Sequence, residues 1–89
     1  MSREEESLIE FPCHFPVKAM GLACDDFDAL VVSIVRKHVD DLPEGAVKNR
    51  PSKSGKYTSV TVTFEATNRA QLDAIYQELS DHPLVLMAL

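Results

Sequence analysis

Residues 57–66 read YTSVTVTFEA, the clearest alternation of apolar and polar side chains in the chain. Val60, Val62 and Phe64 fall on one side of an extended strand, whereas Tyr57 and the intervening Ser, Thr and Glu residues fall on the other. A strand of this kind has one face in a core and one face that meets water or a partner. The stretch therefore predicts a sheet with one covered and one open face.

Three further strands are predicted on either side of this stretch. The segment 15–22 alternates in the same way, and Gly21 near its end permits a turn or a close backbone approach. The segment 46–51 is short and polar, and Pro51 places it at a sheet edge because proline cannot donate to a neighbouring strand. The segment 84–89 is apolar on both faces.

Two helices are predicted between these strands. The first begins at Asp25 or Asp26, and an Asp25 cap would make Asp28 part of a variant capping box. The second is capped by Thr67 or Asn68. Each helix carries an apolar stripe with helical spacing, formed by Phe27, Leu30, Val31, Ile34, Val35 and His38 in the first and by Leu72, Ile75, Tyr76 and Leu79 in the second.

The resulting order is βαββαβ, which predicts an α+β, ferredoxin-like sandwich: a four-stranded antiparallel sheet with two helices on one face. Residues 8–89 are expected to form a single domain, after a disordered tail at 1–7. The second and fourth strands should lie at the edges. An apolar edge strand invites aggregation, so residues 8–12, a second copy of the chain or a partner should cover it.

Charge and composition narrow the classes of function. The 89-residue chain has fourteen acids and nine Lys plus Arg residues, a net charge of -5 that disfavours nucleic acid and anionic membranes as general partners. No apolar run is long enough to span a bilayer, and the N-terminus lacks signal-peptide features, so a cytoplasmic protein is expected. In that setting Cys13 and Cys24 are expected to be reduced thiols.

The charge is unevenly distributed along the chain. Residues 46–64 carry four bases and no acid, which leaves five bases and fourteen acids elsewhere, a net charge of -9. This pattern predicts either a solvated basic hairpin or a lobe that binds an anion or an acidic partner. Hydroxyl groups and a free amide in the turn would suit phosphate or carboxylate. The candidate binding residues are Lys48, Arg50, Lys53, Ser54, Gly55, Lys56 and Tyr57.

Four stretches resemble the YbeD-like family of small bacterial proteins of unknown function. They are Leu8-Ile9-Glu10-Phe11-Pro12, Lys18-Ala19-Met20-Gly21, Pro51-Ser52-Lys53-Ser54-Gly55-Lys56-Tyr57 with Ser59-Val60, and Ile75-Tyr76-Gln77-Glu78-Leu79. The resemblance implies a ferredoxin-like fold close to ACT-type regulatory domains, and some members are labelled lipoate regulatory protein. It implies no catalytic residues. By analogy with ACT domains, Met20 and Gly21 are a possible ligand site.

Catalysis, metal binding and RNA binding have little support in the residues. Helix capping explains Asp25 and Asp26, and a helix C-terminus explains His38. No CxxC or HxxxH spacing indicates a metal, and no cofactor is expected. Tyr57 is the one aromatic residue expected on the open strand face, too few for an RNA-stacking platform.

The sequence thus favours a non-catalytic regulatory or adaptor domain, not an enzyme. A protein partner would meet the basic hairpin and the open sheet face, and a homodimer could form through the sheet face or the C-terminal edge strand. The alternative is an ACT-like small-ligand sensor with its site near Gly21. RNA binding is a remote third option.

Overall fold

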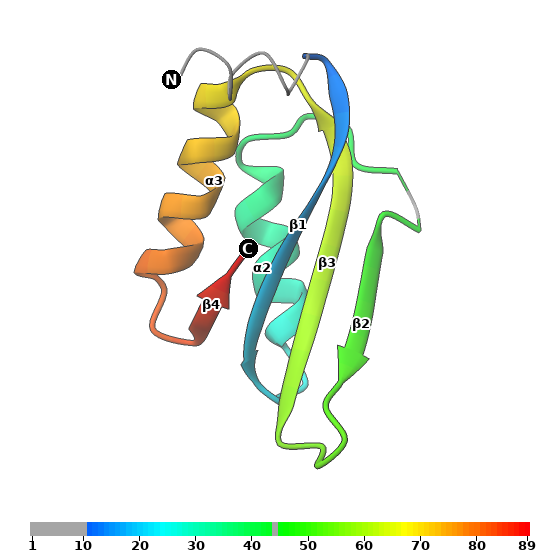
Figure 1. The fold of residues 1–89 in the computed structure, drawn as a ribbon, viewed down its shortest axis with the longest axis vertical. Coiled ribbons are helices and arrows are strands. Elements are labelled where there is room, and N and C mark those ends of the chain that lie inside the picture. Colours follow the sequence, from blue (N-terminus) through cyan, green and yellow to red (C-terminus); the bar gives the residue numbers. More distant parts are fainter. Residues whose placement is uncertain (1–10, 44) are drawn as a thin grey trace, which may run out of the picture.

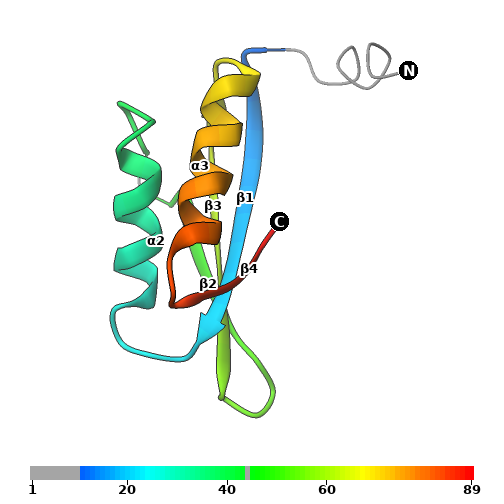
Figure 2. The same cartoon turned by 90° about the vertical axis from the view of Figure 1, so that its left-hand side faces the viewer.

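The computed structural model describes residues 11–43 and 45–89, so the expected tail at 1–7 and most of the segment 8–12 lie outside the described residues. The elements are, in order, β1 (Cys13–Leu22), α2 (Phe27–Arg36), β2 (Val47–Pro51), β3 (Tyr57–Ala66), α3 (Arg69–Asp81) and β4 (Val85–Ala88). Figures 1 and 2 show both helices on one face of the sheet. The predicted ferredoxin-like βαββαβ fold is confirmed.

The strands lie in the order β2-β3-β1-β4, and every neighbouring pair is antiparallel. The predicted edge positions of the second and fourth strands are therefore correct. The bounds differ slightly, because β1 begins two residues earlier than expected, β2 begins at Val47, and β4 is shorter than the segment 84–89.

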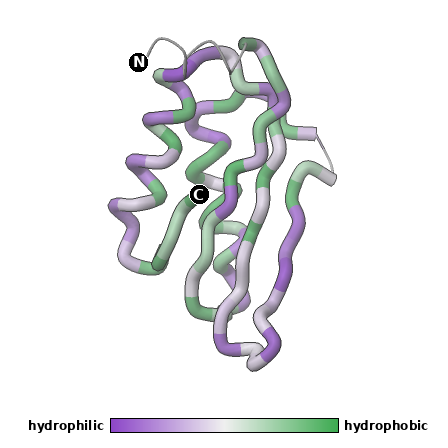
Figure 3. The backbone as a smooth tube through the Cα atoms, viewed as in Figure 1, coloured by the Kyte–Doolittle hydropathy of each residue, from purple (hydrophilic) through white to green (hydrophobic). Residues whose placement is uncertain are grey.

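The central pair, β1 and β3, fixes the two faces of the sheet. Ten residue pairs match without a register shift, from Cys13 with Ala66 to Leu22 with Tyr57. The side chains predicted to face inward are buried beneath the helices, and the alternation along both strands is visible in Figure 3. Phe27, Val31 and Val35 of α2 and Ile75 and Leu79 of α3 complete this core.

Both helices begin at predicted positions, Asp26 and Asn68, but only one of these two side chains caps its helix. The Asn68 side chain caps α3 by accepting a hydrogen bond from the Gln71 amide at 2.8 Å. The variant capping box expected for the first helix is wrong, since the N-cap is Asp26 and its side chain makes no cap hydrogen bond. Asp26 has φ -104° and ψ 6°, not the extended conformation that lets a cap side chain fold back. The Asp28 carboxylate instead accepts from the Ala29 amide.

Pro16 lies in the central strand β1, and it is accommodated there because the neighbouring strand β4 is short. Lys18 and Leu89 exchange two backbone hydrogen bonds, of 3.0 and 2.7 Å. Backbone nitrogens two residues apart on a strand point to the same side, so the nitrogen of Pro16 points to the side of β4, as that of Lys18 does. The pairing with β4 does not extend as far as Pro16. The missing N–H of Pro16 therefore removes no ladder bond.

Gly21 is required by packing. The register between β1 and β4 shifts between Met20 and Gly21, and a Cβ on Gly21 would lie 2.5 Å from both the Leu84 carbonyl oxygen and the Phe27 ring. Neither a backbone carbonyl group nor a buried aromatic ring can move away from such a short contact without disturbing the close packing around it. The predicted close approach is thus realised inside the core.

Replacing Gly21 with Ala should lower the free energy of unfolding by about 2–3 kcal/mol, because the added methyl group overpacks this contact. Urea denaturation of the full chain would measure the loss. Gly55→Ala is the matched control, since its Cβ meets no atom within 4 Å and only the strain of a positive φ, about 1 kcal/mol, is expected. Equal losses at the two positions would contradict the packing explanation.

Candidate functional site

The open face of the sheet carries a row of cations across its middle. Lys48 of β2 and Lys18 of β1 both pair with Thr61 of β3, one on each side. Both lysines are exposed, and Leu89 continues the row next to Lys18. With strands about 4.8 Å apart, the Cα atoms of Lys18 and Lys48 are separated by about 10 Å. Two positive side chains therefore flank one threonine.

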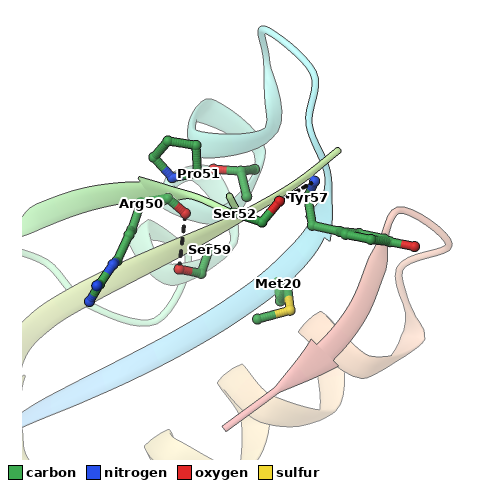
Figure 4. Close-up of a pocket in the computed structure, with 7 residues that line it drawn as sticks. Met20, Arg50, Pro51, Ser52, Tyr57 and Ser59 are labelled. Atoms are coloured by element: carbon green, nitrogen blue, oxygen red, sulfur yellow. Dashed lines mark hydrogen bonds between the residues drawn. The ribbon is translucent and has the colours of Figure 1, made fainter. Parts of the chain in front are cut away.

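The neighbouring row joins a cation to two methionines. Arg50, Ser59, Met20 and Met87 lie opposite one another from β2 through β3 and β1 to β4. The Ser59 hydroxyl donates to the Arg50 carbonyl at 3.3 Å, which ties the edge strand to the centre of the sheet (Figure 4).

A hollow of about 250 Å³ opens on this second row. Its lining residues are Met20, Arg50, Pro51, Ser52, Tyr57, Thr58 and Ser59. Figure 4 shows Met20 below the strands that carry Arg50 and Ser59, with the Tyr57 ring reaching across the sheet beside it. The hollow brings together residues from the two sites that were predicted separately, since Met20 belonged to the possible ligand site and Arg50 and Tyr57 to the basic lobe.

The two predicted ligand-site residues lie on opposite faces of β1. Met20 is half-buried on the open face, where it lines the hollow. Gly21 is buried, and the space in front of its Cα is filled by Phe27 and the Leu84 carbonyl. Space for a ligand therefore exists beside Met20 and not in front of Gly21.

The turn between β2 and β3 is held together by its own polar groups. The Ser52 hydroxyl accepts from the Tyr57 amide at 3.1 Å, and the Ser54 hydroxyl accepts from the Lys56 amide at 3.2 Å. The expected free amide at Gly55 is wrong, because this amide donates to the Ser52 carbonyl at 3.0 Å. These groups give the turn its shape, and they are engaged within the turn itself.

Lys53 and Lys56 are the exposed cations of this turn. The Lys56 ammonium group lies 5.8 Å from the centroid of the Tyr57 ring, within range of a cation–π contact. This contact links the turn to the hollow, because Tyr57 lines the hollow as well.

The positive side chains of the open face and the turn have no carboxylate partner within the described part of the chain. These five cations, named here the basic cluster, are Lys18, Lys48, Arg50, Lys53 and Lys56. Among described residues of the sheet, Glu65 brings the one carboxylate side chain to this face, at the far end opposite His14. The basic cluster thus holds uncompensated positive charge.

Exposed apolar side chains lie at the end of β1 and in and next to β4. Leu22, Leu84, Leu86, Met87 and Leu89 are each 50–63% exposed. Met87 lies next to Met20, and Leu89 next to Lys18. Met87 and Leu89 thus place exposed apolar side chains beside the open-face residues of β1.

The sequence prediction missed several residues of this surface. Lys18, Met87 and Leu89 were outside the predicted site, although the alternation of the first strand had already placed Lys18 and Met20 on one face. Their proximity to Arg50 and Lys48 depends on strand order and register, which join segments far apart in the chain.

A second polar cluster joins the two helices. The Lys37 ammonium group and His38 Nε2 both contact the Glu78 carboxylate, His38 at 2.9 Å. The hydrogen bond from Lys37 is the largest cause, and that with His38 the next, of a lowered pKa at Glu78. His38 lies after the end of α2, not on its apolar stripe as predicted. The cluster fastens the end of α2 to α3.

Other candidate chemistry is sparse in residues 11–43 and 45–89. Cys13 is half-buried and Cys24 is exposed, and both are free thiols. No three His, Cys, Asp or Glu side chains in this range gather as a metal site would require. Neither described helix is long and apolar enough to cross a membrane.

Comparisons with known proteins place the chain among uncharacterised relatives. Residues 6–89 match the model of a family described as "Protein of unknown function (DUF493)". A UPF0250 protein of Nitrosomonas europaea is 48% identical over 85 residues, covering 96% of this chain and 98% of the relative. A UPF0250 protein of Paraburkholderia phytofirmans is 46% identical over the full length of both chains.

A solved structure supports the fold independently. The solution structure of protein HP0495 from H. pylori superposes with a TM-score of 0.68 over 91% of this chain and 85% of that one. At 21% sequence identity this likeness bears on the fold alone.

The carboxyl group of Glu78 should titrate below the ordinary pKa of glutamate, about 4.3. Because its folded pKa lies below the unfolded value, the linked stabilisation is present above the unfolded pKa and is lost as the pH falls through the folded pKa. Side-chain ¹³C NMR would follow the titration. Lys37→Ala should raise the midpoint, whereas Lys48→Ala, on the other face of the sheet, should not. A midpoint indifferent to Lys37 would contradict the assignment.

Proposed function

The chain belongs to the DUF493 family of proteins of unknown function, and from that premise we propose that it is a non-catalytic regulatory or adaptor domain. A protein partner binds it through the open sheet face and the basic turn between β2 and β3. The observation that carries this proposal is the coincidence, on one face, of the unpaired basic cluster, the hollow and the exposed apolar residues of β4.

The helical side differs in charge: a hollow of about 350 Å³, where α2 ends and α3 begins, is lined by Asp40, Asp41 and Glu65 and by no Lys or Arg. There the helices pack on the sheet, and their polar side chains satisfy one another, as in the pairs of Lys37 with Glu78 and Arg69 with Asp73. Each exposed pair contributes little to stability but compensates the charge of Lys37 and Arg69, whereas the exposed carboxylates of Asp25, Asp26 and Asp81 have no ion-pair partner among the described residues. An acidic partner therefore gains more from the open face.

The proposal assigns no chemical step. Among the described residues, the titratable groups with shifted pKa values are Glu78 and Tyr76, both on α3, and burial raises the pKa of Tyr76. Both residues lie on the helical layer, on the other side of the sheet from the hollow that Met20 and Tyr57 line. Residues with shifted pKa values inside a cleft would indicate catalysis. In this structure the residues with shifted pKa values and the hollow lie on different sides of the sheet.

Charge also bears on whether the partner is a second copy of the chain. A symmetric sheet-to-sheet dimer would bring Lys18, Lys48 and Arg50 of one copy against the same residues of the other. Like charges facing each other oppose association. The open face therefore favours a different protein over self-pairing.

Photo-crosslinking in living cells would test the proposal. A benzophenone amino acid in place of Thr61, at the centre of the open face, should yield a discrete adduct with another protein. The same residue in place of Ser33, exposed on α2, is the matched control and should yield none. Adducts that form equally from both positions, or only from α2, would count against the open face.

Charge reversal then tests the part played by the turn. Lys53→Glu combined with Lys56→Glu should reduce the Thr61 adduct at least tenfold, because two exposed cations would be replaced by carboxylates that repel an acidic partner. The turn should keep its shape, since its hydrogen bonds use backbone groups and the Ser52 and Ser54 hydroxyls. An unchanged adduct would remove the turn from the interface.

A small-ligand sensor is a second candidate, and the hollow beside Met20 is the observation that favours it. The resemblance to ACT-type domains suggested such a role, with the amino acids and lipoate as ligand classes to examine. In the structure the available volume lies between Met20 and Tyr57.

Chemical-shift titration of the full chain with amino acids, lipoate and octanoate would test the sensor. A true ligand should move the backbone resonances of Met20, Tyr57 and Ser59 in a saturable way. Absence of shifts across this panel at millimolar concentration would exclude these ligands from the hollow.

A further inference from the structure

We propose that the open face binds an extended acidic segment of another protein, and that one large apolar side chain of this segment fills the hollow between Met20 and Tyr57. This inference rests on the proposed function and specifies the chemistry of the partner. It follows from how charge, apolar surface and spacing coincide on the two cross-strand rows.

Spacing on the face matches an extended chain. The row of Lys48, Thr61 and Lys18 lies two residues along the strands from the row of Arg50, Ser59 and Met20, which is about 7 Å. Side chains i and i+2 of an extended segment are separated by the same distance. A segment that runs along the strands can therefore place one side chain over each row.

The two cross-strand rows favour different side chains in the bound segment. A carboxylate above Thr61 would lie between Lys18 and Lys48, whose ammonium groups have no carboxylate partner among the described residues. Flexible lysine side chains can converge on such a group from both sides. The first row thus favours an acidic residue.

The second row favours an apolar residue with a nearby acid. Met20, Pro51 and Tyr57 line the hollow with apolar surface, and a buried aromatic or aliphatic anchor supplies most of the energy in many interfaces. Arg50 stands at the rim, where its guanidinium can take a second carboxylate. The expected signature is an acidic residue two positions from a large apolar residue.

Other occupants fit the face less well. A single-stranded RNA would find one Phe or Tyr ring, that of Tyr57, on the open face of the described sheet, and the net charge of -9 outside residues 46–64 would repel its phosphates. A second copy of the chain would place its own Lys and Arg side chains against those of the first, and like charges repel. An acidic protein segment needs no stacking platform, and it is repelled less than RNA because it carries a few carboxylates and not one negative charge per nucleotide.

Selection from a random library of displayed 12-residue peptides on the immobilised full chain would test the inference. Enriched peptides should be net negative and carry the acidic-x-apolar spacing. Fluorescence anisotropy with a resynthesised peptide should show at least tenfold weaker binding to Arg50→Ala and to Lys18→Ala. Both side chains are exposed, so both variants should fold. Arg69→Ala removes a cation from α3 and is the matched control, with affinity within twofold of the parent protein.

The outcomes separate this inference from the proposed function. Neutral or basic peptides that bind the open face would overturn the acidic segment and leave the proposed function standing. Peptides that lose affinity in Arg69→Ala, but not in Arg50→Ala, would overturn both. A 12-nucleotide RNA that displaces the peptides at lower concentration would also overturn the inference. So would an adduct from the Thr61 position to a second copy of the chain, because a second copy would then occupy the face.

Discussion

The antiparallel pairing of β1 with β3 is the constraint on which the other features depend. All ten residues of each strand are paired in register, so the alternation of both strands coincides over their full length. A slip of one residue would turn Val17 and Ala19 toward solvent and Lys18 toward the helices. Burial of these apolar side chains against the helices therefore fixes, at the same time, the polar composition of the open face.

The short fourth strand gives this face its apolar border. The register shift between Met20 and Gly21 lets Val85 remain buried while Met87 and Leu89 come beside the open-face residues of β1. Gly21 permits the shift, because any side chain there would meet the Leu84 carbonyl. Core packing at one position thus determines which apolar groups are exposed beside the cations on the other side of the sheet.

The sequence was a good guide wherever a feature depends on neighbours along the chain. Alternation predicted both faces of β3, Pro51 predicted the edge strand, and Asn68 predicted the start of α3. The first helix cap failed because the backbone conformation at Asp26, and not its residue type, decides whether the side chain can fold back.

Features that depend on tertiary contact could not be read in the same way. The predicted lobe contained Arg50 and Tyr57, but the hollow also needs Met20, which enters through strand pairing. Likewise, nothing in the pattern of α3 indicated that Glu78 would meet Lys37 and His38, since that contact follows from how the helices pack. The amide of Gly55 was misjudged because its partner, the Ser52 carbonyl, is set by the conformation of the turn.

The separation of charge gives the open face a role that the net charge conceals. At physiological ionic strength charges are screened over about 8 Å, so an approaching molecule feels the nearest face more than the total of -5. An acidic molecule is repelled by most of the surface and attracted by the basic cluster, which selects one orientation of encounter. Apolar contacts at Met20 and Met87 act only after that orientation is reached, since they are short-ranged. In the proposed complex, charge therefore selects the partner and its approach, and the apolar hollow would set the rate of dissociation.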